Sequence, residues 1–89
     1  MTNPYSVRLT SRAQKDLKGL PDSQQKRIMQ KIFVLADNRH PSQFKPLIGK
    51  ALAMYRVRVG DYRILYDVYD DDEAVVVMRI GHRKDIYRI

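Results

Sequence analysis

The sequence has no cysteine, only two histidines and four isolated glycines, and each shortage removes a class of site. Without cysteine there is no disulfide framework, no thiolate nucleophile and no cysteine-based zinc site. His40 and His82 stand at no metal-ligand spacing with the acidic residues. The separate glycines form no phosphate-binding loop. We therefore expect a protein that works without a metal or another cofactor.

Long apolar runs are also missing. No segment approaches the ~18 apolar residues of a membrane span, and the N-terminal "MTNPYSVRLT" lacks the apolar core of a signal peptide. The acidic run "DDDE" at 70–73 lacks the glycine and glutamate positions of an EF-hand loop, which favours a solvated turn. We expect one domain, residues 1–89, in the cytoplasm and without a membrane partner.

Positive charge dominates what is present. The net charge is +7 and the sequence pI is about 9.9. Residues 1–52 hold ten Lys or Arg against three Asp, whereas residues 53–89 hold seven basic and seven acidic residues. Such an excess points to a nucleic acid, an acidic protein or both as partners.

Two helices are predicted near the N-terminus, after a strand over 5–10. Ser11 is the expected N-cap of the first, with Gln14 completing a capping box. Asp22 with Gln25 repeats that signal for the second helix. The second helix carries an apolar stripe at helical spacing, formed by Ile28, Ile32, Leu35 and Ala36.

The rest of the chain reads as strands. Residues 38–53 have no period and predict a long connection, with Phe44, Leu47 and Ile48 against the core. "AVVVMRIG" at 74–81 is continuously apolar, which is typical of a central strand. The order β-α-α-β-β-β predicts an α+β fold, with two N-terminal helices packed on a small, mostly antiparallel four-stranded sheet.

The segment "MYRVRVGDYRILYDVY" (54–69) predicts a hairpin about Gly60-Asp61, with Gly60 at positive φ. A two-residue loop pairs Arg58 with Arg63. Strand alternation places one group of residues, with its tyrosines in core packing, on one face: Tyr55, Val57, Val59, Tyr62, Ile64 and Tyr66. The opposite face, expected to be open and shallow, carries Arg56, Arg58 and Arg63.

Three clustered arginines have two interpretations. They can be solubilising residues, each paired with a carboxylate such as Asp67. Alternatively they bind an anion, because like charges directly opposite on a sheet cost up to roughly 1 kcal/mol that a polyanion would offset. The clustering favours the anion site.

The C-terminal "HRKDIYRI" follows the last strand and brings His82, Arg83, Lys84 and Tyr87 within reach of the same face. A frayed basic terminus is the competing interpretation.

The two segments "YRVRVGDYRILY" and "VMRIGHRKDIY", together with "FKPLIG", resemble the RelE/ParE superfamily of toxins, and more closely its RelE branch of ribosome-dependent mRNA endonucleases. The resemblance covers nearly the whole chain. It implies a toxin of a type II toxin–antitoxin system that cuts mRNA in the ribosomal A site without a metal. The implied partners are an acidic cognate antitoxin, the ribosome and mRNA, and operator DNA only through the antitoxin.

The resemblance also implies a residue set. The catalytic positions of the family fall on Arg56, Arg58, Arg63, Arg83 and Tyr87, where the best-known members have lysine at the first two. Tyr87, with its pKa lowered by guanidiniums, would take the 2′-OH proton, and His82 or water would serve as acid. Lys84 and Arg88 are expected to bind substrate.

Two other functions stay open. A ParE-like toxin would inhibit DNA gyrase without catalysis on the same fold. A nucleic-acid-binding corepressor would act only together with its antitoxin.

Overall fold

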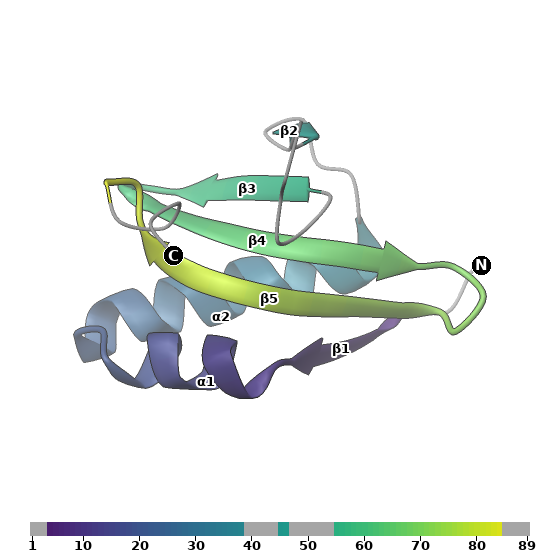
Figure 1. Ribbon diagram of the computed structural model, residues 1–89, viewed down its shortest axis with the longest axis horizontal. Coiled ribbons are helices and arrows are strands. Elements are labelled where there is room, and N and C mark those ends of the chain that lie inside the picture. Colours follow the sequence, from purple (N-terminus) through teal and green to yellow (C-terminus); the bar gives the residue numbers. More distant parts are fainter. Residues whose placement is uncertain (1–3, 39–44, 47–54, 85–89) are drawn as a thin grey trace.

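A computed structural model of the chain describes residues 4–38, 45–46 and 55–84, and these form a helical layer against one sheet (Figure 1). The helices are α1 (Ser11–Lys18) and α2 (Asp22–Asp37). The strands are β1 (Ser6–Leu9), β2 (Lys45–Pro46), β3 (Tyr55–Val59), β4 (Tyr62–Tyr69) and β5 (Ala74–His82).

The sheet runs in the order β1-β5-β4-β3-β2. β1 is parallel to β5, and every other pair is antiparallel. The expected α+β fold and the central place of the 74–81 strand are confirmed. β2 is an addition, because the predicted connection contains two residues that pair with Tyr55 and Arg56. Pro46 donates no hydrogen bond, which suits a strand at the edge of the sheet.

Both helices cover the same face of the sheet (Figure 1). The apolar stripe of α2 is buried as predicted, and it packs on the inward residues of the strands. The central members of this core are Ile28, Ile32, Leu35, Val57, Ile64, Tyr66, Val75, Val77 and Ile80. No helix within the described ranges is long and apolar enough to cross a membrane.

The helix starts differ from the expected caps. Thr10, not Ser11, caps α1: its Oγ1 accepts the Ala13 N–H at 3.1 Å and donates to the Met78 carbonyl at 3.0 Å. Ser11 is already the first helical residue, so its side chain lies one position too late. The Gln14 side chain donates to the Leu9 carbonyl instead of closing a capping box.

The second expected cap is also wrong by one position. Pro21 precedes α2 and has no side-chain acceptor, so the helix starts without a side-chain cap. Asp22 lies in the first turn, where its negative charge interacts favourably with the helix dipole. The Gln25 amide donates to the Leu20 carbonyl at 2.8 Å.

Phe44, Leu47 and Ile48, expected against the core, lie outside the described residues.

Candidate functional site

The β3–β4 hairpin has the predicted register. Gly60 takes a φ of 58°, and the two-residue turn places Arg58 directly opposite Arg63. Arg56 lies two residues earlier on the same face, opposite Leu65. The core residues of both strands point the other way, so these arginines share the face that the helices leave uncovered.

A β-bulge in β5 brings a third strand into this arrangement. Leu65 pairs with Arg79 and Tyr66 with Val77, which leaves Met78 as the extra residue. An extra residue reverses which side chains point inward beyond it. Val77 before the bulge and Ile80 after it are therefore both in the core. Strict alternation from Val77 would have sent Arg79 there.

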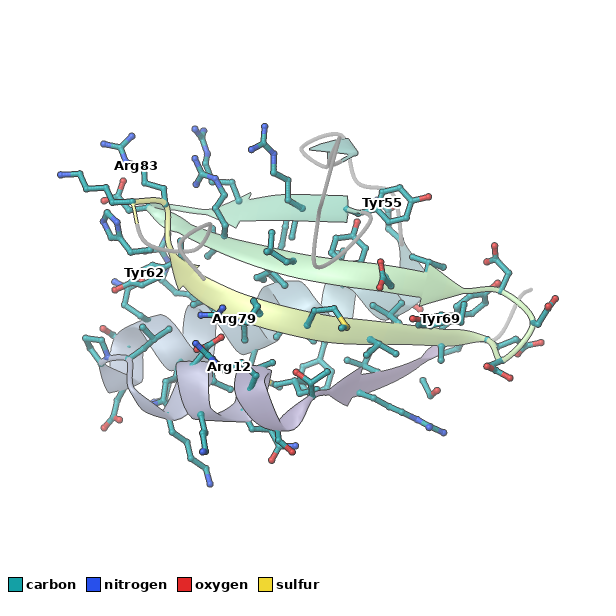
Figure 2. The ribbon with its side chains drawn as sticks, viewed as in Figure 1. Arg12, Tyr55, Tyr62, Tyr69, Arg79 and Arg83 are labelled. Carbon is teal, nitrogen blue, oxygen red and sulfur yellow. The ribbon has the colours of Figure 1, made fainter. Side chains whose placement is uncertain are left out.

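The same reversal determines on which face of the sheet the last residues of β5 lie. Arg63 lies opposite Gly81, and the next residue, His82, lies opposite Tyr62. The Arg83 N–H donates to the Asp61 carbonyl at 2.8 Å, so Arg83 continues the ladder beside the hairpin turn. Figure 2 shows Arg83 at this end of the molecule. By alternation Arg83 faces the same way as Arg63, and the intervening Gly81 has no side chain to separate them.

The structure thus brings Arg58, Arg63 and Arg83 together at one end of the sheet. Arg58 and Arg83 are exposed and Arg63 is half-buried. No carboxylate in the described part of the chain forms an ion pair with any of the three. Among the described residues, the Arg63 guanidinium donates to the carbonyl of its neighbour Tyr62, at 3.3 Å. Such a set of unneutralised cations is suited to binding an anion.

The sequence predicted that the whole arginine face would be open, but part of it is covered. Leu65 lies on this face by alternation, yet it is only 2% exposed. Arg56, directly opposite, is half-buried. The accessible part of the face is therefore its turn end, around Arg58, Arg63 and Arg83.

His82 lies on the opposite face of the sheet from the arginines. It pairs with Tyr62, and the two rings meet edge to face with centroids 5.8 Å apart. The His82 Nδ1 accepts the Lys84 N–H at 3.1 Å, which leaves the proton of the neutral ring on Nε2. Together with Tyr62, His82 lines a shallow hollow against the end of α1. The structure does not bring His82 to the arginines.

Lys84 is exposed one residue beyond Arg83. Tyr87 and Arg88 lie outside the described residues, so their assignment as base and substrate contact rests on the sequence.

The hairpin tyrosines pack in and around the core, as expected. The Tyr55 and Tyr66 rings lie 5.7 Å apart, and Tyr66 is fully buried. Burial, with a smaller effect of nearby Tyr55, raises the pKa of Tyr66 to about 12. Its phenol therefore stays protonated and cannot act as a base.

Sequence reasoning missed Asp16 and Arg79. They form an ion pair between α1 and β5, with 15% of the Asp16 and 12% of the Arg79 side chain exposed. No local pattern links residues 63 positions apart. Within the described ranges, no group of His, Asp or Glu could hold a metal ion.

Comparison with known proteins identifies the family. The profile described as "ParE toxin of type II toxin-antitoxin system, parDE" matches residues 7–87. The sequence is 39% identical over 89 residues to "Toxin RelG" of Mycobacterium tuberculosis, covering 96% of this chain and 98% of the relative. It is 34% identical over 87 residues to "Putative toxin RelE1" of Methanocaldococcus jannaschii, covering 94% of this chain and 96% of the relative. The chain therefore belongs to the RelE/ParE superfamily of toxins of type II toxin–antitoxin systems.

Solved structures agree with this assignment. The toxin–antitoxin complex RelBE2 of M. tuberculosis matches with a TM-score of 0.80 and 33% identity, over 90% of this chain and 99% of that chain. The archaeal RelE–RelB complex of Pyrococcus horikoshii matches with a TM-score of 0.78 and 25% identity, over 92% and 98%. The isolated E. coli RelE toxin, at 21% identity and a TM-score of 0.74 over 88% and 83%, shows the shared fold.

Proposed function

We propose that this toxin is a ribosome-dependent endonuclease that cleaves mRNA in the ribosomal A site. The observation that supports this most is the meeting of Arg58, Arg63 and Arg83 at the turn end of one sheet face, with no carboxylate paired to them in the described part of the chain. Guanidiniums bind phosphate in a bidentate manner and stay charged at any physiological pH. RNA offers both the phosphate and, in its 2′-OH, an internal nucleophile.

The reaction needs no group beyond protein side chains, RNA and water. A base removes the 2′-OH proton, and the 2′ oxygen attacks the adjacent phosphorus through a pentavalent phosphorane. The bond to the 5′ oxygen of the next nucleotide then breaks, and that oxygen takes up a proton. The products are a 2′,3′-cyclic phosphate and a 5′-OH. Arg58, Arg63 and Arg83 stabilise the negative charge that grows on the phosphorane.

Tyr87 is the proposed base, because neighbouring guanidiniums lower a tyrosine pKa toward the working range. The position of His82 on the other face favours water over His82 as the acid. Weak acid–base groups suffice where the ribosome supplies the alignment of the reacting atoms.

The partner that restrains the toxin is proposed to be an acidic antitoxin. Two observations support this: the similar structures from M. tuberculosis and P. horikoshii are toxin–antitoxin complexes, and residues 1–52 carry a charge of +7. Long-range attraction between opposite charges speeds association, so the association rate should fall as salt rises.

Primer extension on an mRNA translated with purified ribosomes and toxin tests the proposal. Cuts within codons that need both ribosome and toxin are expected, with no cuts on naked RNA. An intact message at toxin concentrations that stop growth would refute the nuclease.

A second candidate is inhibition of DNA gyrase, favoured by the ParE name of the matching family profile. It predicts gyrase-dependent DNA breaks and loss of supercoiling activity, with intact mRNA. The same purified toxin in a supercoiling assay separates the two functions.

A further inference from the structure

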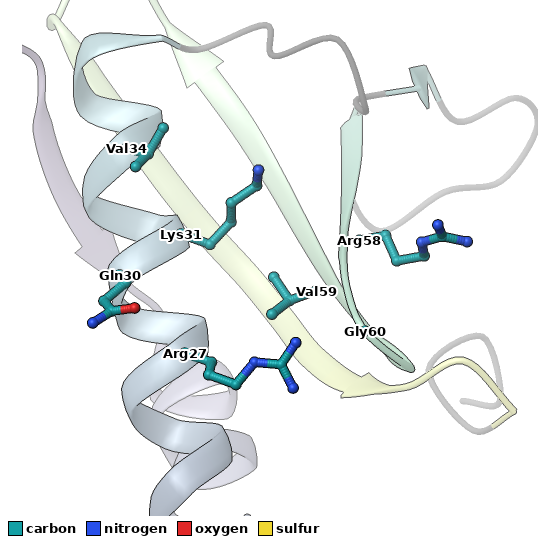
Figure 3. A pocket seen from close by; sticks show the side chains of 7 residues that line it. All are labelled: Arg27, Gln30, Lys31, Val34, Arg58, Val59 and Gly60. Atoms are coloured by element: carbon teal, nitrogen blue, oxygen red, sulfur yellow. The ribbon is translucent and has the colours of Figure 1, made fainter.

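A shallow groove runs between α2 and the hairpin, on the helix side of the sheet (Figure 3). Arg27 and Lys31, one turn apart on α2, line its helix side. Arg58, Val59 and Gly60 line its other side. Figure 3 shows Arg27 and Lys31 extending from α2 toward β3, whereas Arg58 leaves β3 on the side away from the helix. Cations therefore flank the edge of β3 on both sides.

The groove has an excess of positive charge that the described residues do not neutralise. None of the described residues that line it is acidic. Neither Arg27 nor Lys31 forms an ion pair with a carboxylate of the described ranges. Like charges four residues apart on a helix repel each other, so this arrangement costs stability unless an anion is bound.

The Arg27 side chain reaches the hairpin turn. A Cβ on Gly60 would lie 3.4 Å from the Arg27 Nη2, at van der Waals contact distance. The guanidinium therefore packs over the turn backbone, and among the described side chains it donates a hydrogen bond to Gln24, at 3.4 Å. Its remaining donors are available to a ligand in the groove.

Arg58 links this groove to the candidate cleavage site, because it contributes to both. Between the two sites lies the outer edge of β3, the edge away from β4. On that edge β2 pairs only with Tyr55 and Arg56, and no described strand pairs with residues 57–59. A chain of phosphates that crosses the arginine face can pass round this edge and reach Lys31 and Arg27.

We propose that the groove binds the sugar–phosphate backbone of single-stranded RNA that extends from the cleavage site. The inference rests on the proposed function, since it assigns the groove to the same substrate strand. An acidic peptide is the competing occupant. RNA is favoured because the charged side chains that line the groove, Arg27, Lys31 and Arg58, are all cationic, and because Arg58 is shared with the phosphate site.

A matched pair of double variants tests the groove. Arg27→Gln/Lys31→Gln removes one arginine and one lysine from it. Arg8→Gln/Lys26→Gln removes the same charges from exposed positions outside it. Binding of a 2′-O-methyl RNA, which keeps its phosphates but cannot be cleaved, is measured by fluorescence anisotropy at several salt concentrations. Thermal unfolding checks that both double variants are folded. If the Arg27→Gln/Lys31→Gln variant does not fold, the single variant Lys31→Gln is used in its place.

The groove variant is expected to lose affinity by about 10–30-fold near 0.1 M salt, and its salt slope should fall by about 1.4, since each phosphate contact on a single strand contributes ~0.7. The control should keep most of its affinity and slope. Equal losses in both variants would overturn the proposal, because they would reflect net charge. Unchanged RNA binding with weakened antitoxin binding would assign the groove to a peptide instead.

Cleavage on programmed ribosomes is a separate readout. If the unmodified toxin fails to cleave, the proposed function is wrong, while the RNA-binding result still decides the groove. If it cleaves and the groove variant binds and cleaves equally well, only the groove assignment is wrong.

Discussion

Asp16 of α1 holds Arg79 of β5 through a direct ion pair, with 2.8 Å between Asp16 Oδ2 and Arg79 Nε. The same oxygen accepts the Ile80 N–H at 3.0 Å. β1 pairs with β5 only as far as Val77. Beyond that point Thr10 and then Asp16 bond to the outer edge of β5. One carboxylate thus anchors the part of β5 that leads to Arg83.

Replacing Asp16 should destabilise the fold more than a surface ion pair would. Asp16→Ala leaves the largely buried Arg79 guanidinium and the Ile80 N–H without their acceptor, and a loss of about 2–4 kcal/mol is expected. Asp16→Asn keeps a carbonyl oxygen for the Ile80 N–H, so its loss should be about half as large. Urea unfolding of both variants measures this. Midpoints equal to that of the unmodified protein would mean that the ion pair contributes nothing to stability.

Arg58→Ala and Arg63→Ala should abolish cleavage while leaving the fold intact. Each removes one of two like charges that face each other across the hairpin, so stability should rise by a few tenths of a kcal/mol, up to about 1 kcal/mol. Growth inhibition and urea unfolding are the two measurements. Arg8→Ala, at an exposed position on β1, is the control that should stay toxic. If either variant stayed fully toxic, or unfolded, the assignment of these arginines to the cleavage site would be wrong and their role would be structural.

Stability should fall in alkaline solution because of Tyr66. Its pKa is about 12 in the folded protein and ~10 in an unfolded chain. Below pH ~10 both states are protonated and the group has no effect. From there to pH ~12 only the unfolded state loses the proton, so about 2–3 kcal/mol of stability is lost. Unfolding at several pH values should show a shallower decline for Tyr66→Phe than for the unmodified protein. Parallel curves would contradict the assignment.

The role of Tyr87 as a base can be tested by removing only its phenol oxygen. Tyr87→Phe keeps the ring, so single-turnover cleavage on programmed ribosomes should fall by ~10²–10⁴-fold, with ribosome binding nearly unchanged. Unmodified toxin should become more active as pH rises through the tyrosine pKa and then level off. If Tyr87 only stacks on a base, worth ~1–3 kcal/mol, the phenylalanine variant keeps most activity and only Tyr87→Ala is impaired.

The local features of this protein are readable from its sequence. The hairpin register follows from alternation and a two-residue Gly-Asp turn, which are short-range steric constraints, and every predicted pair from Val59–Tyr62 to Arg56–Leu65 is present. The buried stripe of α2 follows from helical periodicity in the same way. The predicted cap of α1 was wrong by one residue because Thr10 and Ser11 are chemically similar candidates, and contact with Met78 selects Thr10.

The meeting of the three arginines depends on contacts between distant segments. Nothing within 74–84 marks Met78 as an extra residue, and strict alternation would have pointed Arg79 into the core. Burying an unpaired guanidinium there would be costly. The bulge avoids this cost, because it turns Arg79 toward Asp16 on α1, 63 positions away, while Ile80 fills the core in its place. The reversal at the bulge also places Arg83 beside Arg63, and it places His82 on the opposite face of the sheet.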